Sequence, residues 1–461
     1  MKLISVFFIV CMAPAVSADL RIGRASVRIT PPKGMPMGGN YYVRLNEGVH
    51  DELYAKAIVL EQDGAKAGMV AVDLVNIPRP IVEAARIAIG KVSSVDGARV
   101  MISATHTHTG PEMGARLRGV DAKIEKLARD YYDALPGTIA QSVRLAEADL
   151  QSARVRAALA REDSVSFIRR YYMKDGSVGW NPGRLNPNVG LATGTIDPDF
   201  PVILFETPVG APLAAYLNFA CHLDTTGGLY YSADYAYKLS KDLETVKGPG
   251  MLTFFTIGAA GNINHIDVNS PAPPPGESQS ARIGTILAAD ALKAMRHLDA
   301  VTAAPLHVAS DTIKLPLAYY DPADLSKARQ VLAAYGKRNA SPFLEQVNAF
   351  KVLELEERHG APMEVEVQVI TLGDQLAWVG LPGEIFVEHG KAIKAASPFP
   401  RTIIAELANG AIGYVPDRKA YPQGAYEVVS ARVGAGAGEM MVDAAVRLLI
   451  QARAKSAFSR F

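Results

Sequence analysis

The chain has almost no cysteine. Only Cys11 and Cys221 occur among its 461 residues, and Cys11 lies in an N-terminal segment that we expect to be removed. A single remaining cysteine cannot form an internal disulfide, so the stability of the mature chain must come from a large hydrophobic core. Hydrophobic residues make up 49% of the sequence, which is enough for such a core.

An excess of charge of one sign is also missing. The formal net charge is +1, so there is no electrostatic argument for binding to nucleic acid or to an anionic membrane. Long apolar runs are missing beyond the N-terminus, and the sequence predicts no transmembrane segment in the mature chain.

The N-terminus has the pattern of a signal peptide. Lys2 supplies a positive charge, residues 3–12 are almost wholly apolar, and Val16-Ser17-Ala18 is a small-residue cleavage site. The apolar run is shorter than the roughly 20 residues that a spanning helix needs. We expect residues 1–18 to be cleaved and the protein to be periplasmic or secreted; a lipidated Cys11 is the weaker alternative.

No linker rich in glycine, serine or charge divides the rest, and no repeat is present, so residues 19–461 are predicted to form one domain. Short runs of β-branched and apolar residues predict buried strands at 55–60, 68–75, 100–103, 202–205, 213–220, 252–257 and 377–381. Amphipathic, alanine-rich segments predict helices at 79–92, 124–147, 278–295, 322–334, 384–396 and 439–452. This alternation predicts an α/β fold, a layered sandwich of mixed sheets.

Polar residues follow several of the predicted strands directly. They include Thr105-His106, Cys221-His222, the segment 258–265 and Pro382-Gly383-Glu384. In open α/β folds ligands bind where strands end and loops begin. We therefore expect these segments to share one cleft.

A metal site is indicated by His106 and His108. Being two residues apart, they project from the same face if the chain is still extended there. Catalytic zinc sites use about three protein ligands and leave a position for water. A lone His-x-His pair is more often solvated or packed, but His222 also follows an apolar strand, and the whole chain has only nine histidines.

Other site residues are weaker candidates on sequence grounds. Glu384 would complete a zinc site, although an acidic residue in the first turn of a helix is also favoured by the helix dipole. Tyr414 alone would be interpreted as a packing residue. Asp73 or Asp234 could accept the second ring proton of a metal-bound histidine.

The segment Ile102 to Pro111 closely resembles the ISATHTHSGP signature of neutral ceramidases, zinc amidases that hydrolyse the N-acyl bond of ceramide. The segments 218–222, 381–384 and 413–415 resemble further motifs of that family, in the same order. The resemblance implies an α/β sandwich and a Zn²⁺ ion bound by His106, His222, Glu384 and Tyr414. It also implies that His108 contacts the scissile group.

Two departures from the family pattern matter for chemistry. Where the family has NxGDxSPN, this chain has Asn262 at the aspartate position and Asn264 at the serine position, and asparagine cannot be that nucleophile. The chain also ends soon after Tyr414, so we expect it to lack the family's C-terminal domain. The simplest chemistry is then attack by a zinc-bound hydroxide, with His108 as proton donor or oxyanion stabiliser.

Asn264 is expected to orient the substrate or donate to the oxyanion. Asn262 and Arg170 are expected to bind substrate, since a bidentate arginine suits an anionic group. The sequence thus predicts an exported zinc hydrolase that cleaves an N-acyl bond in a small molecule or lipid. Action on an ester or an anionic oligosaccharide is one alternative, and an exported metal-binding protein without activity is another.

Overall fold

We describe a computed structural model of the chain, covering residues 20–114, 120–273, 278–335 and 341–458. The expected signal peptide, residues 1–18, lies outside the described residues. No helix in the described ranges is both long and apolar enough to cross a membrane.

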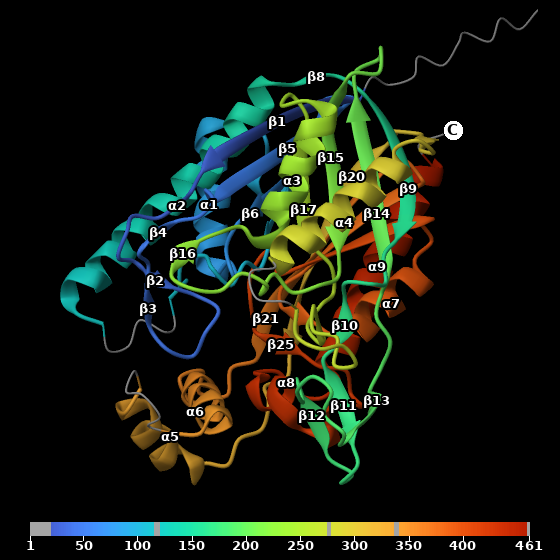
Figure 1. Cartoon of the computed structure of the whole chain (residues 1–461). Helices are drawn as coiled ribbons and strands as arrows, with labels where there is room; N and C mark the ends of the chain where they lie inside the picture. Colours follow the sequence, from blue (N-terminus) through green and yellow to red (C-terminus); the bar gives the residue numbers. More distant parts are fainter. Residues whose placement is uncertain (1–19, 115–119, 274–277, 336–340, 459–461) are drawn as a thin grey trace, which may run out of the picture.

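Three large sheets form the framework of the described part (Figure 1). The first has the order β7-β6-β5-β1-β8, from β1 (Arg21–Arg28), β5 (Tyr54–Gln62), β6 (Ala65–Val72), β7 (Val100–Ala104) and β8 (Gln151–Ser152). The second has the order β17-β15-β14-β9-β19, from β9 (Arg154–Arg161), β14 (Asp199–Glu206), β15 (Pro212–Phe219), β17 (Leu252–Ile257) and β19 (Asp299–Val301). The third has the order β20-β21-β22-β24, from β20 (Leu306–Leu315), β21 (Met363–Leu372), β22 (Leu376–Leu381) and β24 (Arg401–Glu406).

Each sheet combines antiparallel neighbours with a parallel pair. The parallel pairs are β6 with β7, β15 with β17, and β22 with β24. The carboxyl ends of two parallel strands lie at the same edge of a sheet, so each pair can present its following loops together. The predicted class, a layered α/β fold with mixed sheets, is confirmed.

The sheets share one central core because side chains alternate between the two faces of a strand. In β5, Ile58 joins the inner core, which also contains Phe205 and Trp378 from the other two sheets. Its neighbours Ala57 and Val59 point outward, into a core that α1 and α2 complete. Burial on both faces explains why these strands are almost continuously apolar.

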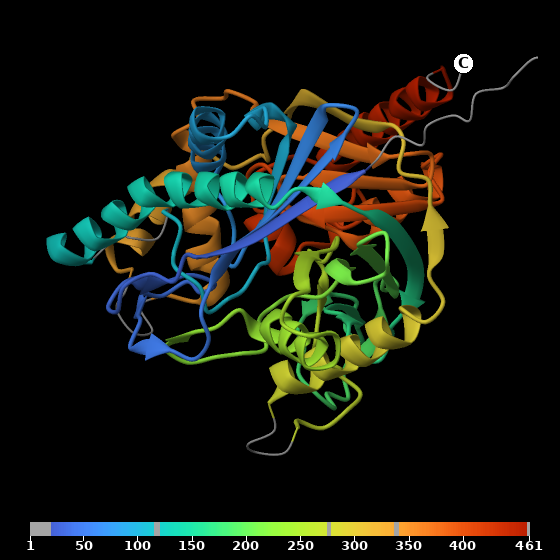
Figure 2. The same ribbon diagram turned by 90° about the horizontal axis from the view of Figure 1, so that it is seen from above.

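Pairs of helices cover the outer faces (Figures 1 and 2). Helices α1 and α2 pack on the first sheet, α3 and α4 on the second, and α7 and α9 on the third. Figure 2 shows α2 and α4 on different sides of the molecule. Their bounds are α1 (Arg79–Val92), α2 (Ala122–Ala148), α3 (Asp234–Lys247), α4 (Gln279–Ala294), α7 (Val387–Ala396) and α9 (Ala437–Phe458).

Small elements gather beyond one end of the sheets, in the lower half of Figure 1. Helices α5 (Asp324–Ala333) and α6 (Phe343–Glu356) pack on each other and on Tyr41. The others are α8 (Ala425–Ser430), β10 (Phe167–Ile168), β11 (Arg170–Met173), β12 (Val178–Trp180), β13 (Val189–Ala192), β18 (Ile263–Asn264), β23 (Glu384–Ile385) and β25 (Tyr414–Val415). Elsewhere lie β2 (Pro36–Met37), β3 (Arg44–Leu45), β4 (Gly48–Val49), β16 (Tyr230–Tyr231) and the 3₁₀ turns Gly97–Arg99 and Tyr421–Gln423.

Candidate metal centre

Each of the three parallel strand pairs delivers one side chain to a common point. His106 follows β7, His222 follows β15, and Glu384 follows β22. An isolated parallel bridge between Thr107 and Leu223 holds the two histidine segments together. The expectation that the polar strand ends share a site is met for these residues.

The backbone and ring of His106 are both held by the loop after β6. Its amide donates to the carbonyl of Leu74 at 2.9 Å, and its φ of +73° lies in the left-handed region. For a non-glycine residue this conformation costs roughly 1–3 kcal/mol. Its Nδ1 lies 2.6 Å from the carbonyl oxygen of Val75, so the proton is on Nδ1 and the lone pair on Nε2.

His222 is oriented in the same way from the second sheet. It is 0% exposed, and its Nδ1 lies 3.0 Å from the carbonyl oxygen of Ala260. The amide of Ala260 in turn donates to Glu406, whose carboxyl also accepts from the amide of Ile385. Glu406 thus connects the loop that orients His222 with the segment that carries Glu384.

His108 lies next to these two rings. Its amide donates to the carbonyl of Leu223 at 2.9 Å, and its Nδ1 lies 3.1 Å from the carbonyl oxygen of Gly39. Its Nε2 is 3.3 Å from Nε2 of His106. The ligand atoms of His106, His108 and His222 all lie within 4.8 Å of one another, and such a group could hold a metal ion.

The arrangement of the donor atoms suits a bound cation better than it suits hydrogen bonds among the side chains themselves. Glu384 Oε2 lies 3.5 Å from His106 Nε2 and 3.4 Å from His222 Nε2. Because a carbonyl only accepts, each ring keeps its proton on Nδ1 and turns a lone pair toward this oxygen. Within the described residues, this buried oxygen has no hydrogen-bond partner. Two imidazole lone pairs and a carboxylate oxygen gathered at one point are a donor set suited to a metal ion.

The protonation states also suit a metal. Burial lowers the pKa of His108 to about 3 and that of His222 to about 4, with neighbouring positive groups adding to the effect. Burial alone would raise the pKa of Glu384, but the two histidines beside it hold that pKa well below its usual range. At neutral pH the rings of His108 and His222 are therefore neutral and the Glu384 carboxylate is charged, which are the forms that bind metals.

Tyr414 is beside Glu384 because β23 and β25 pair in parallel with these two residues in register. The Arg169 guanidinium lies over the Tyr414 ring, 5.2 Å from its centroid. Arg169 also donates to the Gly261 carbonyl at 2.7 Å and reaches His222 Nε2 at 3.1 Å. A cation bound to His222 would displace this last contact.

Arg169 and its partner Glu427 are site residues that the sequence did not identify. Glu427, 0% exposed, accepts from Arg169 at 2.8 Å and from Arg170 at 2.7 Å. The only sequence clue was the Arg-Arg pair between apolar and aromatic residues. Since the two arginines are adjacent, the sequence does not tell which one reaches the site.

The structure places Arg170 away from the donor atoms. It is 1% exposed and binds Glu427 and the Gly424 carbonyl. Asn262 is held by Glu388 and by the amide of Val387, and Asn264 by Asn181 and the amide of Ile266. Each of these three side chains therefore has protein partners in place of an open substrate position.

The expected carboxylate partners of the histidines are wrong. Asp73 accepts from Thr105 and from the amide of Tyr54, while Asp234 accepts from Thr225 and Thr226. Backbone carbonyls of Val75 and Ala260 take the ring protons in their place. The expected position of Glu384 in a helix is also wrong, because α7 begins only at Val387 and Glu384 lies in β23.

A cavity of about 630 Å³ opens onto the centre. Its lining includes the four side chains His106, His108, Glu384 and Tyr414, together with Glu354 and Arg358 of the α6 region and Arg432 near α8. The cavity is large enough for a small organic substrate.

Comparison with solved structures identifies the fold. The chain superposes on the crystal structure of neutral ceramidase from Pseudomonas aeruginosa with a TM-score of 0.71 and 19% identity, covering 94% of this chain and 75% of that one. A ceramidase complexed with C2 gives a TM-score of 0.69 and 20% identity, with coverages of 94% and 76%. No family model matches the chain, and no curated protein matches it. The chain thus has a ceramidase-like fold.

Proposed function

We propose that this chain is a zinc-dependent hydrolase that cleaves an N-acyl amide bond. The observation that carries the proposal is the convergence of His106 Nε2, His222 Nε2 and Glu384 Oε2 on one point. The ligands proposed for Zn²⁺ are His106, His222, Glu384 and Tyr414. The ceramidase-like fold supports an amide as the substrate.

Zinc at this point would polarise the substrate carbonyl and lower the pKa of water from 15.7 to about 7. The protein's part is to orient its donors: the Val75 and Ala260 carbonyls fix the rings of His106 and His222. Burial raises the pKa of the Tyr414 phenol well above its usual range, and the Arg169 guanidinium over its ring partly opposes that shift.

His108 is the proposed proton carrier. Its Nδ1 is held by the Gly39 carbonyl, so its Nε2 would be turned toward the substrate, where it would stabilise the oxyanion or hand a proton to the leaving amine. General acid–base catalysis of this kind contributes roughly 100- to 10,000-fold. In this proposal the role of Asn262, Asn264 and Arg170 is to hold the loops around the site in position, and they do not contact the substrate directly.

A second candidate is hydrolysis or elimination on an anionic carbohydrate. It is favoured by the arginines Arg358 and Arg432 and the aromatic rings of Tyr41 and Tyr426 around the same cavity. Aromatic faces pack on sugar rings, and guanidinium groups bind carboxylates in pairs of hydrogen bonds.

The test uses the mature chain, stripped with a chelator and reloaded with zinc. It is assayed against N-acyl amino acids, N-acyl sphingoid bases, simple esters and uronate-containing oligosaccharides. We expect about one zinc per chain and zinc-dependent release of a free amine. Turnover of the oligosaccharides alone would select the second candidate. One bound zinc without turnover of any of these compounds would indicate a metal-binding protein.

We also propose export, based on the pattern of residues 1–18. Expression of the full chain in a Gram-negative host, followed by N-terminal sequencing of the periplasmic and medium fractions, should give a chain that begins at Asp19. An intact N-terminus retained in the cytoplasm would contradict this.

A further inference from the structure

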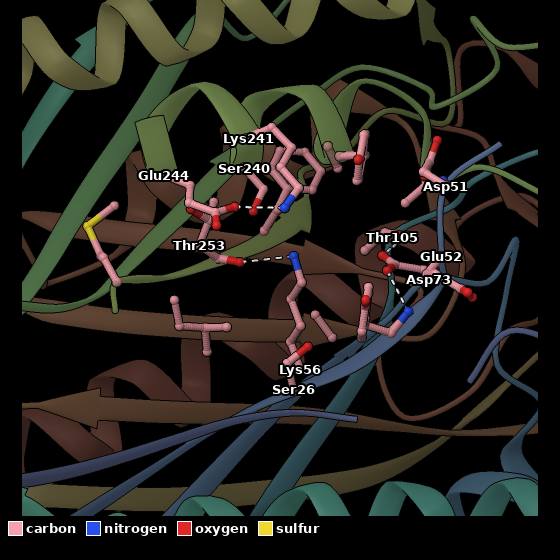
Figure 3. A pocket seen from close by; sticks show the side chains of 18 of the residues that line it. Ser26, Asp51, Glu52, Lys56, Asp73, Thr105, Ser240, Lys241, Glu244 and Thr253 are labelled. Carbon is pink, nitrogen blue, oxygen red and sulfur yellow. Dashed lines mark hydrogen bonds and ion pairs between the residues drawn. The ribbon is translucent and has the colours of Figure 1, made fainter. Parts of the chain in front are cut away.

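A second cavity, of about 760 Å³, lies between the inner face of the first sheet and α3 with β17. Figure 3 shows its walls, with Lys56 on β5 pointing toward the Thr253 carbonyl. It is separate from the metal centre. Asp73 and Thr105 line this cavity, whereas Val75 and His106, farther along the same two segments, line the other one.

Most charged groups around this cavity are already paired. Arg24 binds Asp149 at 3.1 Å, Lys241 binds Glu244 at 2.8 Å, and His50 lies 3.1 Å from Asp51. Glu52 accepts from Thr30 and Arg28. These groups need no ligand to neutralise them.

Lys56 and Asp73 are the exception. Within residues 20–114, 120–273, 278–335 and 341–458, neither forms an ion pair. Lys56 Nζ makes one hydrogen bond, 3.2 Å to the carbonyl of Thr253, which leaves two of its three N–H groups free. Asp73 accepts from the Tyr54 amide at 2.9 Å and from Thr105 at 3.2 Å, which leaves acceptor capacity on its carboxylate.

Burial makes both charges unfavourable, although each partly offsets the penalty of the other through its opposite charge. Burial raises the pKa of Asp73 to about 6 and lowers the pKa of Lys56. A ligand that brought a carboxylate to Lys56 and an ammonium to Asp73 would relieve both penalties.

The strand register sets the spacing of the two groups. Asp73 follows β6 opposite Tyr54, and Lys56 is two residues along β5 from Tyr54. Residues two apart point to the same face, so Lys56 and Asp73 are diagonal neighbours, roughly 7–8 Å apart with their Cβ atoms somewhat closer. Figure 3 shows both side chains at the same cavity. A molecule with its two charges separated by a few bonds fits between them.

We propose that this cavity binds a small zwitterion of the amino-acid type, with its carboxylate on Lys56 and its ammonium on Asp73. The apolar residues Met251, Leu252 and Phe255 of the opposite wall would contact the ligand's carbon atoms. The proposal does not depend on the hydrolase activity.

Isothermal titration of the mature chain with glycine, β-alanine and γ-aminobutyrate tests the proposal, with propionate and propylamine as probes that carry one charge each. The titration is done at about pH 8, above the pKa of Asp73. We expect saturable binding of at least one zwitterion and no comparable binding of the singly charged probes. Lys56→Met and Asp73→Asn should each weaken the Kd about 10- to 100-fold, as expected for losing a charge-assisted hydrogen bond.

Lys241→Met is the matched control, because that lysine lines the same cavity but is paired with Glu244. It should leave the Kd unchanged, and so should His106→Ala, which disrupts only the metal centre. Far-UV circular dichroism and melting temperature establish that each variant is folded. The proposal is overturned if none of the three zwitterions binds, or if propionate or propylamine binds as tightly as they do. It is also overturned if folded Lys56→Met and Asp73→Asn bind the zwitterion as the parent does.

Discussion

Glu384 and Tyr414 face each other in the parallel pairing of β23 and β25. The amide of Glu384 donates to the Gly413 carbonyl at 2.9 Å, which fixes the register. Residues directly opposite in paired strands are close neighbours. The carboxylate and the phenol are therefore brought together by the backbone, before any metal is bound.

This arrangement predicts that Glu384→Gln loses zinc. An amide oxygen carries no charge and is a poorer zinc ligand than a carboxylate. We expect a loss of affinity larger than the 10- to 100-fold typical of an outer-shell change, measured by competition with a zinc-binding dye. The control is Glu83→Gln, at a side chain that is 55% exposed. Unchanged zinc affinity in Glu384→Gln would remove this residue from the ligand set.

The two histidines of the His-Thr-His segment should behave differently. We expect His106→Ala to lose zinc, and His108→Ala to keep it while kcat falls by about 100- to 10,000-fold, the usual size of general acid–base catalysis. Metal content by mass spectrometry and steady-state kinetics measure the two effects. If His108→Ala also loses its metal, the three histidines together are the ligands.

The buried Glu427 should be important for stability. It balances Arg169 and Arg170, whose side chains are 3% and 1% exposed. Glu427→Gln leaves two guanidinium groups without a counter-charge, and breaking a buried pair costs about 3–5 kcal/mol. Urea unfolding followed by circular dichroism measures this cost. Glu125→Gln, in an exposed pair with Arg129, should not change the curve, and equal curves for both variants would contradict the prediction.

Gly261 should tolerate no side chain. A Cβ atom there would lie 2.4 Å from the carbonyl oxygen of Glu384, so Gly261→Ala must shift the segment that carries Glu384. We expect a destabilisation of about 1–3 kcal/mol, typical of overpacking, together with weaker zinc binding. Gly90→Ala is the control, since among the described residues no atom outside the helix's own backbone and the chain neighbours lies within 4 Å of a Cβ at this position. It should stabilise the fold by about 0.5–1 kcal/mol, and a similar gain in Gly261→Ala would refute the prediction.

Asp73 should give the fold a pH dependence. Its pKa is raised by burial from 3.8 to about 6, so the folded chain binds this proton more tightly than the unfolded chain does. The stabilisation that this proton gives the folded state is fully present below pH 3.8 and is lost as the pH rises through about 6. The free energy of unfolding falls by ~3 kcal/mol over this range. Urea unfolding between these limits should show a smaller decline in Asp73→Asn than in the parent. Parallel pH profiles would contradict the assignment.

Much of the fold could be predicted from local patterns. The helix expected at 79–92 has those bounds as α1, and the strand expected at 252–257 is β17. Strands β20 and β21 are harder to recognise as buried runs, since Asp311 and Glu364 interrupt their apolar residues. Glu384 was expected in a helix because its strand partner, Tyr414, is distant in the sequence, and local propensity carries no information about such pairing.

For the site, the sequence indicated which residues gather but not how they are held. His106, His222, Glu384 and Tyr414 are close together in the structure, as the motifs suggested. The partners of the histidine rings are backbone carbonyls, and every residue has one, so no side-chain pattern could identify Val75 or Ala260. Glu427 was missed because a buried counter-charge looks like any surface glutamate until the fold is known.

The origin of His106, His222 and Glu384 from three different sheets has a consequence for folding. A partly folded chain with one sheet undocked would lack one of these side chains, and its affinity for the ion would be reduced. Binding free energy would then be gained only by the fully assembled native state. Adding zinc should therefore stabilise the fully assembled state more than any state with an undocked sheet, and so raise the melting temperature.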